Sequence, residues 1–148
     1  MSKRSGKPFG QRFPVTEVHV FRPYPDEVPW ELLAELPVDE ALLREALERN
    51  LLRVGKHEGR VVGSYAIGPR TPLSFELIAL VVADGCRRRG IGRWLVGHAI
   101  GLAETKGARE IVARRCAGPG AAAAERFLVR AGFRPDDGPM LRFVLTPE

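Results

Sequence analysis

The pattern of apolar and polar residues predicts a domain in which helices and strands are mixed. Residues 74–82 (SFELIALVV) are apolar on both faces after Glu76, which is typical of a central strand covered on both sides. Residues 91–106 carry apolar side chains at every third or fourth position, which predicts a helix with one buried face. Gly107 would end this helix. A buried strand that leads directly into an amphipathic helix is therefore the expected centre of the fold.

Shorter segments on either side complete the expected order of elements. Before the central strand we expect a strand, two helices separated by Pro37, and a hairpin of two strands whose end leads into a turn at 68–72. After the long helix we expect a strand, a short helix stopped by Gly132, and a last strand. The expected segments are 16–22, 26–36, 38–50, 51–56, 60–67, 109–116, 121–131 and 141–145. This order predicts a mixed α/β fold with one main sheet.

Length and composition predict one ordinary domain. The chain has 148 residues, of which 45% are apolar. Residues 1–14 are basic and polar, so we expect a flexible tail there and a single domain over 15–148. The longest apolar run, 77–83, is too short to cross a bilayer, and no apolar segment follows the basic N-terminal residues. We therefore expect a cytoplasmic protein without a membrane partner, in which Cys86 and Cys116 are free thiols.

Charge is divided unevenly along the chain. Residues 15–50 carry nine acidic residues and three arginines, whereas residues 51–148 carry sixteen basic and nine acidic residues. The division suggests an anionic partner for the C-terminal part. For the acidic segment it suggests either a cationic partner or simply a solvated face.

The basic loop between the central strand and the long helix is the best candidate for a binding site. Residues 85–93 read GCRRRGIGR. Glycines let the backbone approach a ligand, and the N–H groups of a helix N-terminus attract phosphate. The loop's arginines could add charge-assisted hydrogen bonds: Arg87, Arg88, Arg89 and Arg93. Ile91-Gly92 stands where a P-loop needs Lys-Ser/Thr, and Leu95 where a dinucleotide motif needs its third glycine, which disfavours both sites.

The loop resembles the pyrophosphate-binding motif of the GNAT superfamily of N-acetyltransferases, Gln/Arg-x-x-Gly-x-Gly/Ala. The matching run is Arg87-Arg88-Arg89-Gly90-Ile91-Gly92, and Val82 takes the hydrophobic strand position five residues before it. Residues 121–133 (AAAAERFLVRAGF) resemble a second motif of this superfamily, Asn-x-x-Ala-x-x-Phe-Tyr-x-x-x-Gly-Phe. The order of elements is similar over about 16–146, although the specific motifs lie within 74–133.

The resemblance implies both a fold and a ligand. The fold would be GNAT-like, with a mixed, mainly antiparallel central sheet flanked by helices. The ligand would be acetyl-CoA, used as a cosubstrate without a metal. Backbone groups of Leu80, Val81 and Val82 would pair with the pantetheine arm. Backbone amides from Arg87 to Arg93 would hold the pyrophosphate, and side chains of Arg87 to Arg89, with Arg130, could reach the terminal phosphate. Apart from what the resemblance implies, the chain could also form a homodimer.

The groups that transfer protons are where the chain departs from the family's pattern. The motif's tyrosine often protonates the leaving thiolate in the superfamily, but Leu128 stands at that position and Ala121 replaces the asparagine. A protonated amine acceptor also needs a general base. Glu76 is the candidate catalytic residue because it is the one ionisable residue of its strand after Ser74, and it resembles the glutamate base of the histone-acetylating branch. The alternative is an exposed carboxylate at the start of the strand.

The acceptor would be an amine-bearing small molecule or peptide. In the superfamily its site is formed by the two early helices, the turn before the central strand and the loop before the last strand, here about 26–50, 68–73 and 134–140. Two alternative functions remain open. One is a non-catalytic acyl-CoA sensor, which the loss of the tyrosine and asparagine would suit. The other is a nucleic-acid-binding domain, which is disfavoured because no aromatic residues interleave with the arginines.

Overall fold

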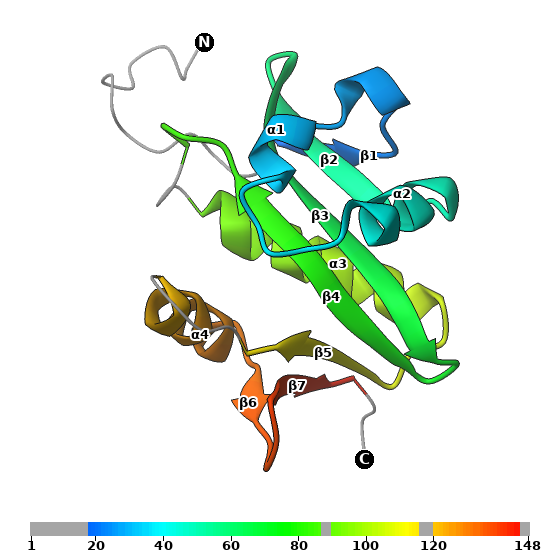
Figure 1. Ribbon diagram of the computed structural model, residues 1–148, viewed down its shortest axis with the longest axis vertical. Helices are drawn as coiled ribbons and strands as arrows, with labels where there is room; N and C mark the ends of the chain where they lie inside the picture. Colours follow the sequence, from blue (N-terminus) through cyan, green and yellow to red (C-terminus); the bar gives the residue numbers. More distant parts are fainter. Residues whose placement is uncertain (1–17, 87–89, 116–119, 146–148) are drawn as a thin grey trace, which may run out of the picture.

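One twisted sheet organises the computed structural model, which describes residues 18–86, 90–115 and 120–145. Within these residues the sheet has seven strands in the order β1-β2-β3-β4-β5-β7-β6 (Figure 1). The strands are β1 His19–Phe21, β2 Leu52–His57, β3 Arg60–Thr71, β4 Ser74–Val82, β5 Glu110–Arg114, β6 Arg134–Pro135 and β7 Met140–Val144. Only β4 and β5 are parallel; the other neighbouring pairs are antiparallel. The expected mixed, mainly antiparallel α/β fold is therefore confirmed.

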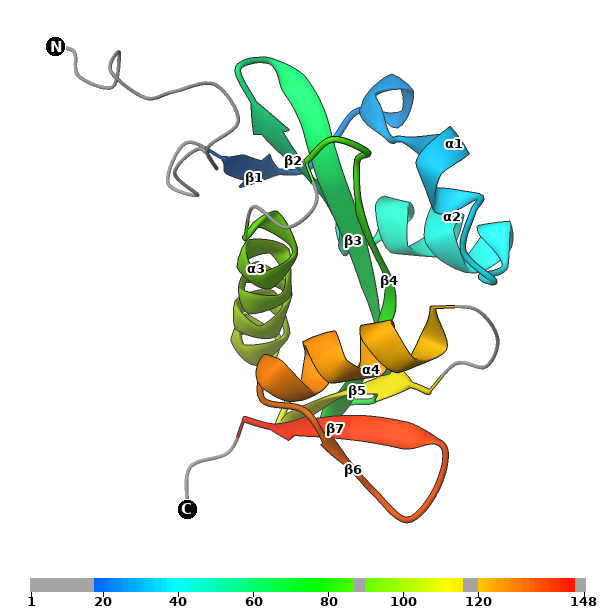
Figure 2. The same cartoon turned by 90° about the vertical axis from the view of Figure 1, so that its left-hand side faces the viewer.

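Helices cover both faces of the sheet. The helices are α1 Trp30–Leu33, α2 Glu40–Glu48, α3 Ile91–Thr105 and α4 Ala121–Arg130, with a short 3₁₀ helix at Pro25–Glu27. Figure 2 shows α1 and α2 on one side of β3 and β4, and α3 on the other side. No helix of the described residues is long and apolar enough to cross a membrane.

The predicted pairing of β4 with α3 forms the core. Buried side chains along α3 are Ile91, Leu95, Val96, Ala99 and Ala103. Ala103 is buried in place of the expected Leu102, which is only partly covered. β4 alternates buried and partly buried residues, because it lies between the α1–α2 layer and α3. The central strand and the long helix thus lie where the apolar pattern put them.

The prolines mark the places where the sequence-based elements were wrong. The helix expected at 26–36 is divided into the 3₁₀ helix and the four-residue α1, because Pro29 interrupts it as the residue that caps α1. The turn expected at 68–72 is also wrong, because β3 continues to Thr71 and the chain turns at Pro72 and Leu73. Pro69 is accommodated within β3 beside a shift of register.

The parallel pair at the centre of the sheet separates after three residues. Ser74, Phe75 and Glu76 of β4 pair with β5, and the pairing ends there. Figure 1 shows the two strands diverging from this closed end. Beyond it, β4 keeps β3 as its neighbour on one side and, within the described residues, has no strand on the other. This opening in the sheet positions the candidate site.

Candidate active site

Glu76 lies at the branch point of the opening. It pairs with Gly68 of β3 and with Val112 of β5, and it is the last residue of β4 that pairs with β5. Next to it, Leu77 and Ala79 face consecutive residues of β3, so that Ile78 forms a bulge. Bulges bend a strand and change the direction of its side chains. This bulge therefore lies between Glu76 and the end of β4 that leads to α3.

The part of β4 beyond its pairing with β5 contains the residues expected to meet a pantetheine arm. Leu80 and Val81 pair with Tyr65 and Ser64 of β3, and Val82 pairs with Gly63. β5 pairs with none of the three. In an antiparallel pair, alternate residues direct their N–H and C=O groups away from the partner strand. This edge can therefore accept an extended ligand as an additional strand.

The N-terminus of α3 has the features of an anion site. Gly90 is the N-cap residue, has a left-handed backbone (φ +85°) and makes no side-chain cap hydrogen bond. The first turn contains no acidic residue, so no carboxylate of the turn itself opposes an anion at its N–H groups. Arg93 is exposed beside it. The arginines Arg87, Arg88 and Arg89, also expected to bind phosphate, lie outside the described residues.

Packing against α4 explains the second glycine of the loop motif. A Cβ atom at Gly92 would lie 3.2 Å from Cζ of Phe127 and 3.7 Å from Cγ2 of Val82. The motif position is therefore small because the Phe127 ring packs directly on the first turn of α3. Leu128, at the position of the family's tyrosine, is partly buried against the core and offers no proton donor.

The end of α4 also depends on a glycine. Gly132 has φ +114°, and a Cβ atom there would lie 2.6 Å from Cε2 of Phe143 on β7. The next residue, Phe133, is fully buried and its ring lies 5.6 Å from that of Phe143. The Gly-Phe pair of the second motif thus turns the chain from α4 into the sheet edge.

Glu76 also lines a cavity between α2 and the β3–β4 hairpin. The cavity has a volume of about 130 Å³. Its walls are formed by Leu42, Glu45, Ala46, Arg49, Leu51, Ile67, Gly68, Pro69, Glu76 and Ile78. These residues fall mainly within two segments expected to form the acceptor site, 26–50 and 68–73. Sequence reasoning named these segments but not the cavity itself, because no motif marks its apolar walls.

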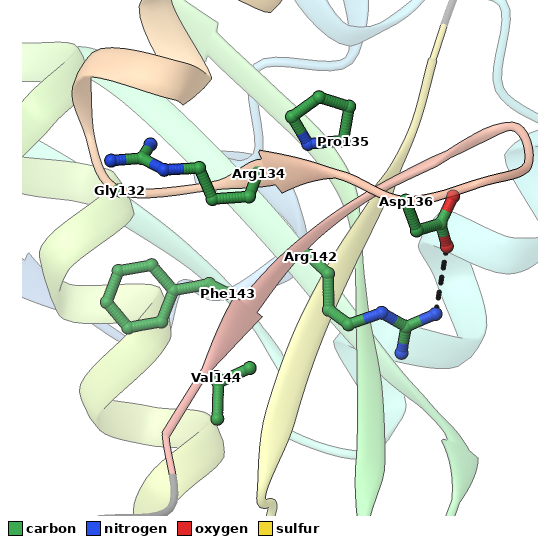
Figure 3. A pocket seen from close by; sticks show the side chains of 7 residues that line it. All are labelled: Gly132, Arg134, Pro135, Asp136, Arg142, Phe143 and Val144. Atoms are coloured by element: carbon green, nitrogen blue, oxygen red, sulfur yellow. Dashed lines mark hydrogen bonds and ion pairs between the residues drawn. The ribbon is translucent and has the colours of Figure 1, made fainter.

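The third expected acceptor segment, 134–140, lines a different hollow. This depression, of about 330 Å³, lies over β6 and β7. Figure 3 shows Arg134 and Phe143 directed toward one side of it, while Arg142 turns to Asp136. Glu76 is not among its lining residues. The larger hollow is therefore separate from the carboxylate expected to act as base.

An ionic network ties the strands together at the closed end of the opening. Arg142 of β7 donates a hydrogen bond to Glu110 of β5. It donates a second one, at 2.9 Å, to Asp136, which Figure 3 shows. The Ser74 hydroxyl of β4 donates to Glu110 at 2.6 Å. Backbone N–H of Gly138 and the Arg142 guanidinium lower the pKa of Asp136. Burial alone would raise the pKa of Glu110, but hydrogen bonds from Ser74 and Arg142 outweigh it and the pKa is lowered. No sequence motif indicated this network.

A second polar pair lies on the face of the sheet that α3 covers, opposite the face covered by α1 and α2. The hydroxyl of buried Tyr65 is 2.7 Å from Nδ1 of His98 on α3. Burial lowers the pKa of His98, and the charge of Arg53 lowers it further. Burial also raises the pKa of Tyr65, so its hydroxyl stays protonated, and the tautomer of the imidazole decides which of the two groups donates the hydrogen bond. This pair is separated by the sheet from the cavity that contains Glu76.

The remaining candidates concern cysteine and metal chemistry. Cys86 is a free thiol, and Cys116 lies outside the described residues. In the part of the chain that the structure describes, no three His, Cys, Asp or Glu residues are grouped so that they could hold a metal ion.

Solved structures with the same fold are acetyltransferases. A GNAT family acetyltransferase from Elizabethkingia anophelis with acetyl-CoA bound aligns with a TM-score of 0.72 at 18% identity, over 87% of this chain and 99% of that one. A Bacillus subtilis acetyltransferase in complex with CoA aligns with a TM-score of 0.68 at 20% identity, over 88% and 99%. N-acetylglutamate synthase from Neisseria gonorrhoeae, with coenzyme A and N-acetyl-glutamate, aligns with a TM-score of 0.70 at 18% identity, over 88% and 35%.

Sequence comparison identifies the family. Among curated proteins, none matches the chain significantly. The model of the acetyltransferase (GNAT) family matches residues 14–133, which is more than half of the chain. This segment includes β4, the loop and α3, and it ends at the Gly-Phe pair after α4. The chain therefore belongs to the GNAT family of acetyltransferases.

Proposed function

We propose that this protein is an N-acetyltransferase that moves an acetyl group from acetyl-CoA directly to a primary amine of a small molecule or peptide. The observation that carries the proposal is the edge of β4 beyond its pairing with β5, which leads to the glycine-capped N-terminus of α3. An edge of this kind suits an extended amide-containing arm, and a helix N-terminus suits a diphosphate. Acetyl-CoA combines these two features, and the related structures contain it or CoA.

Different residues of this chain would bind different parts of the cosubstrate. Backbone groups of Leu80, Val81 and Val82 would pair with the pantetheine arm. Backbone amides of Gly90, Ile91, Gly92 and Arg93 would hold the diphosphate. Side chains of Arg87, Arg88 and Arg89 would add charge-assisted hydrogen bonds to the phosphates. The absence of an acid from the first turn of α3 supports this assignment, because a carboxylate there would repel the ligand.

The chemistry requires three proton transfers and one exchange of bonds. The neutral amine nitrogen attacks the thioester carbonyl carbon, a C–N bond forms, the nitrogen loses its second proton to solvent, and the C–S bond breaks to release CoA as a thiolate. Alkyl amines, with a pKa near ~10.4, are mostly protonated at neutral pH, so a base must first remove a proton. Glu76 would accept it, directly or through water, since it lies at the branch point and lines the α2 cavity. Water would protonate the thiolate because Leu128 cannot.

Replacing Glu76 tests the assignment of the base. The Glu76→Gln variant keeps the size of the side chain but cannot accept the proton, so we expect kcat to fall by roughly 10²–10⁴-fold. Binding of acetyl-CoA should be nearly unchanged, because the expected CoA contacts lie elsewhere. Turnover is measured as thiol release with an amine acceptor, and binding by calorimetry. Glu104→Gln, which removes an exposed carboxylate of α3, is the matched control. Turnover equal to that of the control would show that Glu76 is not the base.

A non-catalytic acyl-CoA sensor is the second candidate. Leu128 and Ala121 at the positions of the motif tyrosine and asparagine favour it. A sensor would bind acetyl-CoA with wild-type affinity and release no thiol with any amine, whereas the enzyme would release thiol at a rate that depends on the acceptor.

A further inference from the structure

The cavity under α2 has apolar walls and a single acidic end. Six of its lining residues are apolar, namely Leu42, Ala46, Leu51, Ile67, Pro69 and Ile78. Glu76 provides the carboxylate at the branch point of the sheet. Leu42 is 48% exposed at the rim of the cavity, so a ligand in the cavity could cover it.

The charges around the cavity leave one negative charge in excess. Arg49 forms an ion pair with Glu45 at 3.0 Å, one helical turn apart on α2. These two charges compensate each other, so the carboxylate of Glu76 is the uncompensated charge among the lining residues. A cationic amine would be attracted to this end, whereas a second carboxylate on the ligand would be repelled.

We propose that the acceptor is a primary amine with a compact apolar group next to its nitrogen and no carboxylate, and that the α2 cavity binds this apolar group. The inference rests on the proposed function, because it places the acceptor nitrogen at Glu76. The volume of about 130 Å³ indicates the size of the group that the cavity could cover. It is close to the ~150 Å³ of an apolar protein cavity that accepts benzene, so a branched group of about four to six carbons would fit.

A matched pair of acceptors tests the apolar preference. Leucinamide and glycinamide have the same amine and amide groups and differ in the isobutyl side chain. We expect kcat/KM for leucinamide to exceed that for glycinamide by roughly 10- to 200-fold, because the side chain would be buried in the cavity. Equal values for the two amides, with turnover of both, would overturn the inference while the proposed function stands.

A substitution at the rim of the cavity tests the location. Leu42→Trp adds bulk at an exposed position of α2, so it should partly fill the cavity without disturbing the core. We expect it to lower kcat/KM for leucinamide at least about fivefold more than kcat/KM for glycinamide, which has no side chain for the cavity to bind. Ala41→Trp is the matched control, since Ala41 is exposed on the same helix and does not line the cavity. Equal effects of the two tryptophans would contradict the assigned cavity.

Free leucine tests the charge preference. We expect leucine to be a poorer acceptor than leucinamide, and Glu45→Gln to reduce that difference roughly fivefold because it leaves Arg49 without its partner. Comparing the same two acceptors in each variant cancels the difference in their own amine pKa. Glu48→Gln, an exposed carboxylate outside the cavity, should leave the ratio unchanged. A ratio that does not respond to Glu45→Gln would refute the charge argument. Acetyl-CoA binding without acetylation of any of these amines would refute the proposed function as well.

Discussion

Replacing Gly132 with alanine should destabilise the protein for two separable reasons. The backbone at Gly132 has φ +114°, a conformation that costs an L-residue about 1–2 kcal/mol. The new Cβ atom would also lie 2.6 Å from Cε2 and 3.1 Å from Cδ2 of Phe143. These are ring carbons held against Phe133, so they cannot move away freely, and such overpacking costs about 1–3 kcal/mol.

The two contributions together give a loss of about 2–5 kcal/mol in the free energy of unfolding. With a urea slope of about 2 kcal/mol per M, the unfolding midpoint should fall by roughly 1–2.5 M. Urea denaturation followed by circular dichroism measures this shift. Because domains are stable by only about 5–15 kcal/mol, the variant should still fold in the absence of urea, with a small margin.

Two other glycines separate the contributions. Gly107 has φ +91°, and a Cβ atom added there would have no neighbour within 4 Å, so Gly107→Ala should lose only about 1–2 kcal/mol. Gly97 lies exposed within α3 with open space around it, so Gly97→Ala should gain about 0.5–1 kcal/mol. If Gly132→Ala loses no more than Gly107→Ala, the close contact between the end of α4 and Phe143 is wrong.

Two further predictions concern the anion site and the ionic network. Gly90→Asp should weaken acetyl-CoA binding at least about tenfold, because a carboxylate would face the phosphates, while Gly107→Asp at the other end of α3 should have little effect; equal affinities of the two folded variants in calorimetry would remove the α3 N-terminus from the site. The lowered pKa values of Asp136 and Glu110 mean that their stabilisation is complete above their ordinary values of 3.8 and 4.5 and is lost as the pH falls below them. Arg142→Met should therefore lower the urea midpoint at pH 7 and match wild type more closely at pH 3, whereas a difference that is equal at both pH values would indicate lost packing alone.

The sequence predicted the elements whose pattern is local. The apolar run of β4, the spacing of α3 and the stop at Gly132 each depend on neighbouring residues, and their positions agree with the structure within one or two residues. The loop motif is also local, because a strand, a glycine-containing turn and a helix follow one another. These features identified the centre of the fold and the family.

Contacts between distant segments could not be predicted in this way. The partners of Arg142 come from β5 and from the turn before β7, and no spacing in the sequence marks them. The role of Gly92 depends on Phe127 of α4, which lies far along the chain. The short α1 and the continued β3 depend on how Pro29 and Pro69 are accommodated by their neighbours, which a proline's local preference alone does not determine.

Calorimetric titration with acetyl-CoA tests the central claim most directly, namely that the edge of β4 beyond its pairing with β5 and the N-terminus of α3 together bind this cosubstrate. Dephospho-CoA and ATP serve as controls that lack the terminal phosphate or the pantetheine arm. We predict binding in the micromolar range that is stronger for acetyl-CoA than for either control. Absence of binding, or equal binding of ATP, would contradict the claim and would mean that the loop is a structural turn or a site for another anion.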